Sequence, residues 1–226
     1  YCVQNTYHDA DYFNDLIGTK LIAEGRFADA IPYLRKVSTS LLSKQLISVF
    51  ASKRHFDTPR WFGKQYVDDG YEPVKVSRNA KLDFCIDMTS RLSQYSLARE
   101  GNDKQQMAYD LAVRYYQASC YGDCWYLTHY YRSVMDSARS WEKDFAAETV
   151  KYLNVAKQSN DMRLRYNSLY ALAFVPVEPW ATTEYDASNG YNEILVLHPQ
   201  AAQYQALNEL GMFALAHPEA IDDYTR

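Results

Sequence analysis

The feature that most constrains the fold is a helical spacing of apolar residues that few helix breakers interrupt. The 226 residues include only 8 Gly and 7 Pro. From residue 12 to residue 37, apolar side chains recur at the spacing of a helix with one buried face. Glu24, Gly25 and Arg26 interrupt this pattern, and Gly25 suits the left-handed conformation that commonly follows the last turn of a helix. The segment therefore predicts two helices joined by a tight turn.

The same periodicity predicts further helices along the chain. They are expected at residues 82–97, 107–118, 123–138, 141–156, 162–174 and 200–216. Asp123 is expected to cap the third of these, and the Ser159-Asn160-Asp161 turn precedes the fifth. Two segments break the helical rhythm. The first is an aromatic connection over 55–78 with a short capped helix, and the second, residues 175–199, includes the apolar run 194–197 and is expected to hold a short strand. We therefore expect an all-α fold, an array of antiparallel helical hairpins with about nine or ten helices in one continuous domain over residues 1–226.

Small residues within these helix pairs resemble the tetratricopeptide pattern. Gly18 in the first helix is expected to face Ala30 in the second, with the large residue Leu34 four positions on. Ala112 and Thr149 stand in the corresponding places of later pairs, and their separation of 37 residues is near the family's period of about 34. The resemblance implies an α–α superhelix whose surface binds extended peptides or partner proteins.

Residues 108–180 also resemble uncharacterised extracytoplasmic helical-repeat proteins of gut Bacteroidetes. The resemblance rests on segments 115–116, 122–125 and 169–174. It implies a location in the periplasm or on the outer cell surface, and it implies no activity. The chain begins at Tyr1 without Met and ends at Arg226 without a helix stop signal, so we expect a fragment of a longer protein.

Composition and motifs exclude several classes of function. The net charge of −4 leaves no basic surplus for a phosphate backbone, so nucleic acid is not an expected partner. The longest apolar run, residues 169–177, is far shorter than the roughly 20 residues of a membrane helix, so no membrane span is expected. The sequence contains no phosphate loop, dinucleotide fingerprint, zincin motif or nucleophile elbow. We therefore predict no cofactor and no enzymatic activity.

Cys120 and Cys124 are close in sequence across a short turn. They could form a disulfide bond, or they could be buried thiols. The spacing of Cys120, Cys124 and His129 is not a familiar zinc pattern, so no metal is predicted. A Cys124-dependent enzyme is a further alternative, because a thiol in the first turn of a helix can have a lowered pKa. His129, five residues on, would point to a different helix face.

Aromatic residues provide the candidate binding site. Tyr121, Trp125 and Tyr126 flank the turn where two predicted helices meet, and Trp61 and Phe62 lie in the aromatic connection. Exposed rings supply contact area at low entropic cost, although rings can also fill seams between helices. The sequence predicts a non-enzymatic helical-repeat module that binds a protein or peptide partner in the cell envelope. A glycan-binding protein of a surface carbohydrate-uptake system is the alternative.

Overall fold

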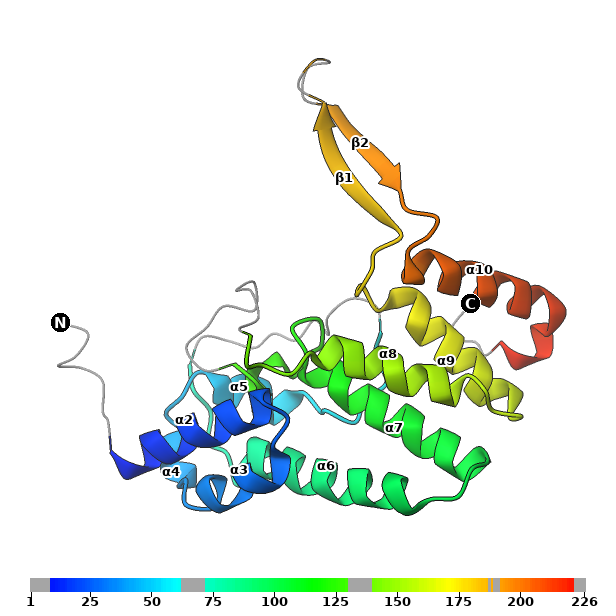
Figure 1. Cartoon of the computed structure of the whole chain (residues 1–226). Helices are drawn as coiled ribbons and strands as arrows, with labels where there is room; N and C mark the ends of the chain where they lie inside the picture. The colour runs from blue at the N-terminus through cyan, green and yellow to red at the C-terminus, as the bar shows by residue number, and fades with distance from the viewer. Residues whose placement is uncertain (1–8, 62–71, 130–139, 187, 189–191, 222–226) are drawn as a thin grey trace. The chain divides into compact units, whose positions relative to one another are not determined.

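The computed structural model describes residues 9–61, 72–129, 140–186, 188 and 192–221 (Figure 1). Within these ranges the chain is mostly helical, with nine α-helices and one two-stranded sheet. The helices are α2 (Ala10–Ala23), α3 (Phe27–Leu34), α4 (Thr39–Leu42), α5 (Ile47–Lys53), α6 (Ala80–Leu97), α7 (Asn102–Ala118), α8 (Phe145–Ala156), α9 (Met162–Phe174) and α10 (Ala202–Ala216). The predominance of helix confirms the predicted all-α class.

Contacts along the chain divide it into two compact units. Unit 1 comprises Tyr1–Ala98 with Val113–Phe145, and unit 2 comprises Arg99–Ala112 with Ala146–Arg226. One boundary falls within α7, whose last six of 17 residues belong to unit 1. The organisation as one domain over residues 1–226 stays a prediction.

In unit 1, the turn between α2 and α3 has the predicted geometry. Gly25 has a φ of 76°, and its N–H donates to the carbonyl of Ile22 at 2.8 Å. The next N–H, from Arg26, donates to Leu21 at 2.8 Å, which completes the glycine-containing cap of α2. Gly18 lies against Leu34, and a Cβ at position 18 would overlap that side chain. The small residue thus permits the close packing of α2 on α3, with Leu34 as its nearest contact.

Aromatic rings from three helices and the start of α8 meet in the core of unit 1. Phe27 of α3 packs edge-on against Phe84 of α6, with ring centroids 5.6 Å apart. Tyr115 of α7 packs edge-on against Phe145 at 5.2 Å. All four are buried. Such pairs add specific geometry to the burial of apolar area, so they fix how these helices meet.

The predicted helix over residues 123–138 is wrong where the structure describes it. Only a 3-10 turn, η1 (Trp125–Leu127), forms there, and Thr128 and His129 are not helical. Cys124, not Asp123, precedes this turn, and it makes no side-chain cap. Residues 130–139 lie outside the described residues. The following helix, α8, begins at Phe145 and not at residue 141. In the connection over 55–78, the described residues form turns and bends but no helix.

In unit 2, α9 follows the predicted bounds. Asp161 caps it, since its carboxylate accepts from the N–H groups of Arg163 and Leu164 at 2.9 and 3.1 Å. A hairpin of β1 (Ala181–Asp186) and β2 (Asn192–Leu197) then precedes α10. One short strand was expected within residues 175–199, and the described residues of that range form two, with β2 containing the apolar run 194–197. Tyr166 and Leu169 of α9 pack on Phe213 of α10, which joins these two helices.

Candidate functional site

The turn between α7 and η1 is built against the end of α7. The side chain of Gln117 closes it: Oε1 accepts from the Asp123 N–H at 2.9 Å, and Nε2 donates to the Thr58 carbonyl at 2.8 Å. The Cys124 N–H donates to the Gln117 carbonyl at 2.9 Å. A Cβ on Gly122 would overlap backbone atoms at the end of α7, so this position requires glycine. The segment is therefore a packed loop, which explains why it does not begin a helix.

Two of the five rings predicted to bind a partner are buried in unit 1. Trp61 is 5% exposed and Tyr126 is 1% exposed. Trp61 packs on Tyr116 with ring centroids 5.0 Å apart, and the Tyr116 hydroxyl donates to the Trp61 carbonyl at 2.8 Å. Burial raises the pKa of Tyr126 well above its ordinary value. A buried ring offers no surface to a partner, so these two side chains act in the core.

Tyr121 and Trp125 are the predicted rings that reach solvent. Tyr121 is exposed, and Trp125 is half-buried with its ring centroid 5.8 Å from that of Phe50. The pKa of Tyr121 is raised, first by partial burial and then by the neighbouring Cys120. The fifth predicted residue, Phe62, lies outside the described residues. The described part of the aromatic site therefore presents one exposed ring and part of another.

The structure records Cys85, Cys120 and Cys124 as thiols. The disulfide considered between Cys120 and Cys124 is therefore not formed in it. Cys124 is fully buried and Cys120 is half-buried, so the two side chains lie in different surroundings across the turn. Burial raises the pKa of Cys85 and of Cys124 to about 12. A thiol with this pKa is protonated at neutral pH and is a poor nucleophile, which gives no support to a Cys124-dependent enzyme.

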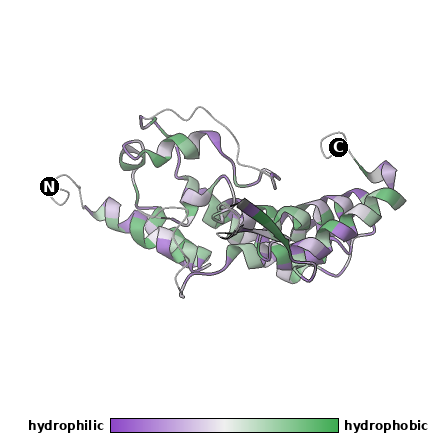
Figure 2. Cartoon of the chain, turned by 90° about the horizontal axis from the view of Figure 1, so that it is seen from above, coloured by the Kyte–Doolittle hydropathy of each residue, from purple (hydrophilic) through white to green (hydrophobic). Residues whose placement is uncertain are grey.

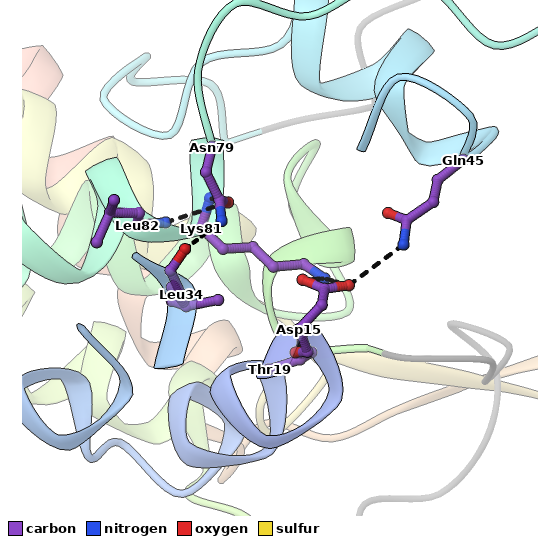
Figure 3. A network of polar contacts seen from close by, with 7 residues as sticks. All are labelled: Asp15, Thr19, Leu34, Gln45, Asn79, Lys81 and Leu82. Carbon is purple, nitrogen blue, oxygen red and sulfur yellow. Dashed lines mark hydrogen bonds and ion pairs between the residues drawn. The ribbon is translucent and has the colours of Figure 1, made fainter. Parts of the chain in front are cut away.

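A buried ion pair joins α2 and α6 (Figure 3). Lys81 Nζ donates to both carboxylate oxygens of Asp15, at 2.9 and 3.1 Å, and the two side chains are 4% and 0% exposed. Gln45 Nε2 donates to Asp15 Oδ2 at 3.4 Å. Asn79 begins α6 by accepting from the Lys81 N–H, and its Nδ2 donates to the carbonyl of Leu34 at the end of α3. The network therefore ties three helices of unit 1 together.

A small pocket lies beside this ion pair. Apolar residues make up half of its lining, and the other half is Ser48, Arg78, Asn79, Lys81 and Tyr126. Because the Lys81 ammonium is bound by the Asp15 carboxylate, its charge is neutralised within the protein. The ion pair and the hydrogen bonds of Gln45 and Asn79 suit a structural role.

The hairpin of unit 2 exposes apolar side chains on both faces. It projects away from α9 and α10 (Figure 1), and β2 is drawn largely in the green of hydrophobic residues in Figure 2. Its six paired positions run from Ala181 opposite Leu197 to Asp186 opposite Asn192. Tyr185 and Leu195 are 68% and 57% exposed, and they lie on one face with Leu197. Ile194 lies on the other face and is also exposed. None of the residues of this surface is among those predicted from the sequence to bind a partner.

The side chain of Gln203 fixes the base of the hairpin. Gln203 is buried in the first turn of α10; its Oε1 accepts from the Trp180 N–H at 3.0 Å, and its Nε2 donates to the Ala173 carbonyl at 2.9 Å. Its own N–H donates to the Glu178 carbonyl at 3.2 Å. His198 N–H donates to the Trp180 carbonyl at 2.7 Å and continues the ladder below the paired strands. The hairpin is therefore anchored to both α9 and α10, although an isolated hairpin is at best marginally stable in water.

The sequence around the hairpin is acidic and contains no Lys or Arg, although Lys157 outside it pairs with Glu209. None of the 24 Lys and Arg residues falls between positions 166 and 225, whereas 8 of the 28 acidic residues do. Three of these, Glu184, Asp186 and Glu193, belong to the strands. This asymmetry could have been found from the sequence by counting charge in segments rather than over the whole chain.

The described ranges contain neither a candidate metal site nor a candidate membrane-spanning helix. No group of three or more His, Cys, Asp and Glu side chains there could hold a metal ion. No helix in the same ranges is long and apolar enough to cross a membrane.

With this geometry established, we compared the chain with known proteins. No protein-family model, no curated protein and no solved structure matches it. The candidate surfaces must therefore be judged from their own chemistry.

Proposed function

We propose that the protein is a non-enzymatic interaction module that binds a protein or peptide partner through the β1–β2 hairpin. The observation that supports this most is the set of exposed apolar side chains on an element anchored at its base. Contiguous apolar side chains on a projecting element are typical of interaction sites, because their exposure to water is unfavourable until a partner covers them.

Anchoring of the hairpin favours binding on energetic grounds. A surface that is already ordered loses less conformational freedom when a partner docks. Gln203 fixes the hairpin base through its side-chain hydrogen bonds to Trp180 and Ala173. The exposed face of Tyr185 and Leu195 is therefore presented in one orientation relative to α9 and α10.

We also propose that the helices form a tetratricopeptide-like array. The support is the succession of helix pairs joined by short turns: α2 with α3, α6 with α7, and α8 with α9. Gly25 and Gly101, both at positive φ, lie in the first two of these turns. In this proposal the array positions the hairpin, and the location outside the cytoplasm implied by the resemblance to Bacteroidetes proteins is retained.

Parallel selection from a random peptide library and a glycan array tests the proposed function. The wild-type chain is expected to select peptides, and the double variant Leu195→Thr/Leu197→Thr is expected to lose at least tenfold in affinity for them. Threonine keeps a good strand propensity while it removes exposed apolar area. Leu97→Thr is the matched control, because Leu97 is 82% exposed at the end of α6 and belongs to unit 1.

Three outcomes would contradict the proposal. Selected peptides that bind the double variant as tightly as wild type would move the site away from the hairpin. Binding of glycans without peptides would favour the carbohydrate alternative, and Trp125→Ala would then test whether that half-buried ring contributes. Failure to select any peptide would refute peptide binding.

A further inference from the structure

We propose that β2 accepts a third strand from its partner, and that this strand is an extended segment rich in Lys or Arg. The inference rests on the proposed function and specifies how the partner docks. In β-strand addition, the backbone of the added segment pairs with an open sheet edge while its side chains lie on the two faces.

The composition of β2 is that of a strand with neighbours on both sides. Residues 194–197 are Ile-Leu-Val-Leu, so β2 carries apolar side chains on both faces. Such continuous apolar runs are typical of interior strands, whereas edge strands usually alternate with polar residues. Its partner β1 has the polar residues Thr182, Thr183 and Glu184 in succession, as expected of an edge. In the described sheet of two strands, β2 nevertheless pairs on one side alone.

The open edge of β2 carries the backbone groups that an added strand requires. The hydrogen bond from His198 to Trp180 marks a directly bonded pair, and bonded and non-bonded pairs alternate along an antiparallel ladder. Counting from this pair, the N–H and C=O groups of Leu195 and Leu197 point away from β1. The ladder runs without interruption from Ala181 to Asp186, and β2 contains neither Pro nor Lys, which commonly protect an edge.

Charge selects the chemistry of the partner. The hairpin strands contain three acidic residues, and the 60 residues from 166 to 225 contain no Lys or Arg. A second copy of the hairpin would bring like charges together, which opposes pairing between copies. On one face, the basic residues of an alternating segment would instead be attracted to Glu184. On the other face, its apolar residues would cover Leu195 and Leu197.

Synthetic peptides of about ten residues, the upper range of strand length, test this inference. The first alternates Val and Lys, the second alternates Val and Glu, and the third has the composition of the first rearranged with helical spacing. We expect the alternating Val/Lys peptide to bind at least tenfold more tightly than the other two. Binding should protect the amide hydrogens of Leu195 and Leu197 from exchange, while those of Thr183 and Tyr185 on the opposite edge stay unchanged.

Backbone variants separate edge pairing from contact with side chains. Leu195→Pro removes an outward N–H without removing a bond to β1, and we expect it to abolish binding of the Val/Lys peptide. Leu195→Thr keeps the N–H and should weaken binding only several-fold. Thr183→Pro makes the same backbone change on the β1 edge and should leave binding within twofold of wild type.

Different results overturn the inference and the proposed function. If library peptides bind through the hairpin but Leu195 and Leu197 gain no protection, strand addition is wrong and peptide binding stands. Equal binding of the helically spaced or the acidic peptide also overturns the inference, as does absence of binding by all three. The proposed function fails only if the library selection yields no peptide, or if the selected peptides bind the Leu195→Thr/Leu197→Thr variant as tightly as wild type.

Discussion

The buried pair of Asp15 and Lys81 allows a prediction with opposite outcomes for single and double substitutions. Replacement of Lys81 by Met keeps an unbranched side chain one atom shorter and removes the charge. The Asp15 carboxylate, 0% exposed, then retains Gln45 at 3.4 Å from Oδ2 but loses both bonds from Nζ. We expect Lys81→Met to lower the free energy of unfolding by about 3–5 kcal/mol, because removal of one partner leaves an uncompensated buried charge.

The magnitude follows from two opposing contributions. At the 2.9 Å separation, an effective dielectric constant of about 20 gives an attraction of roughly 6 kcal/mol. Transfer of each ion from water costs several kcal/mol, so the intact pair is close to neutral overall. The double variant Asp15→Leu/Lys81→Met removes both contributions together. Its stability should therefore return to within about 2 kcal/mol of wild type.

Urea denaturation followed by tryptophan fluorescence provides the assay. Three of the four Trp residues, Trp61, Trp125 and Trp141, belong to unit 1, which contains the ion pair. If a single variant does not fold, recovery of a cooperative transition in the double variant is the decisive observation. A cost below about 1 kcal/mol for Lys81→Met, or effects that simply add in the double variant, would refute the reasoning.

Three further predictions concern the loop, the hairpin base and the thiols. Gly122→Ala should lower the urea midpoint and the free energy of unfolding by about 1–3 kcal/mol, because the added Cβ overlaps backbone atoms. Gly211→Ala is the control: its Cβ meets no atom within 4 Å, so stability should stay unchanged or rise by up to about 1 kcal/mol. Gln203→Leu should leave the Trp180 N–H and the buried Ala173 carbonyl without their side-chain partner and accelerate amide exchange throughout the hairpin. Uniformly slow exchange in the variant would contradict the anchoring role of Gln203. Burial raises the pKa of Cys85 and Cys124 from 9.0 to about 12. Their stabilisation of the fold is therefore fully present below pH 9 and is lost as the pH rises toward 12, because only the unfolded chain releases these protons in that range. A double Ala variant should lose less stability than wild type over the same pH range in alkaline denaturation.

Helix ends set by local residues could be predicted from the sequence. Asp161 accepts from the N–H groups of the first turn of α9, so a short-range pattern specifies where that helix begins. Gly25 likewise determines the end of α2 through its positive φ. In both cases the interacting groups are within a few positions of one another, which is the range that periodicity and capping rules describe.

The loop after α7 could not be predicted in this way. Its conformation depends on Gln117, whose side chain bonds to Asp123 on one side and to Thr58, distant in sequence, on the other. The burial of Trp61 and Tyr126 has a similar origin, since neighbours remote in sequence cover them. Aromatic residues that fill a core and those that bind a partner are of the same types, so their spacing in the sequence does not distinguish the two roles.

The hairpin was missed because its two unusual properties disappear in averages over the whole chain. The net charge of −4 does not reveal that residues 166–225 contain no Lys or Arg. The apolar fraction of the whole chain likewise does not reveal that β2, a strand at the edge of its sheet, has the apolar run typical of an interior strand. Lysine is the residue that commonly protects an edge strand from pairing, and its absence leaves β2 both acidic in its surroundings and open along its backbone. Retained acidic residues such as Glu184 and Glu193 oppose pairing between copies, yet they attract a basic segment. An open edge that repels a second copy of itself and attracts a cationic strand discriminates between these two partners. An edge strand protected by lysine would not attract a cationic strand.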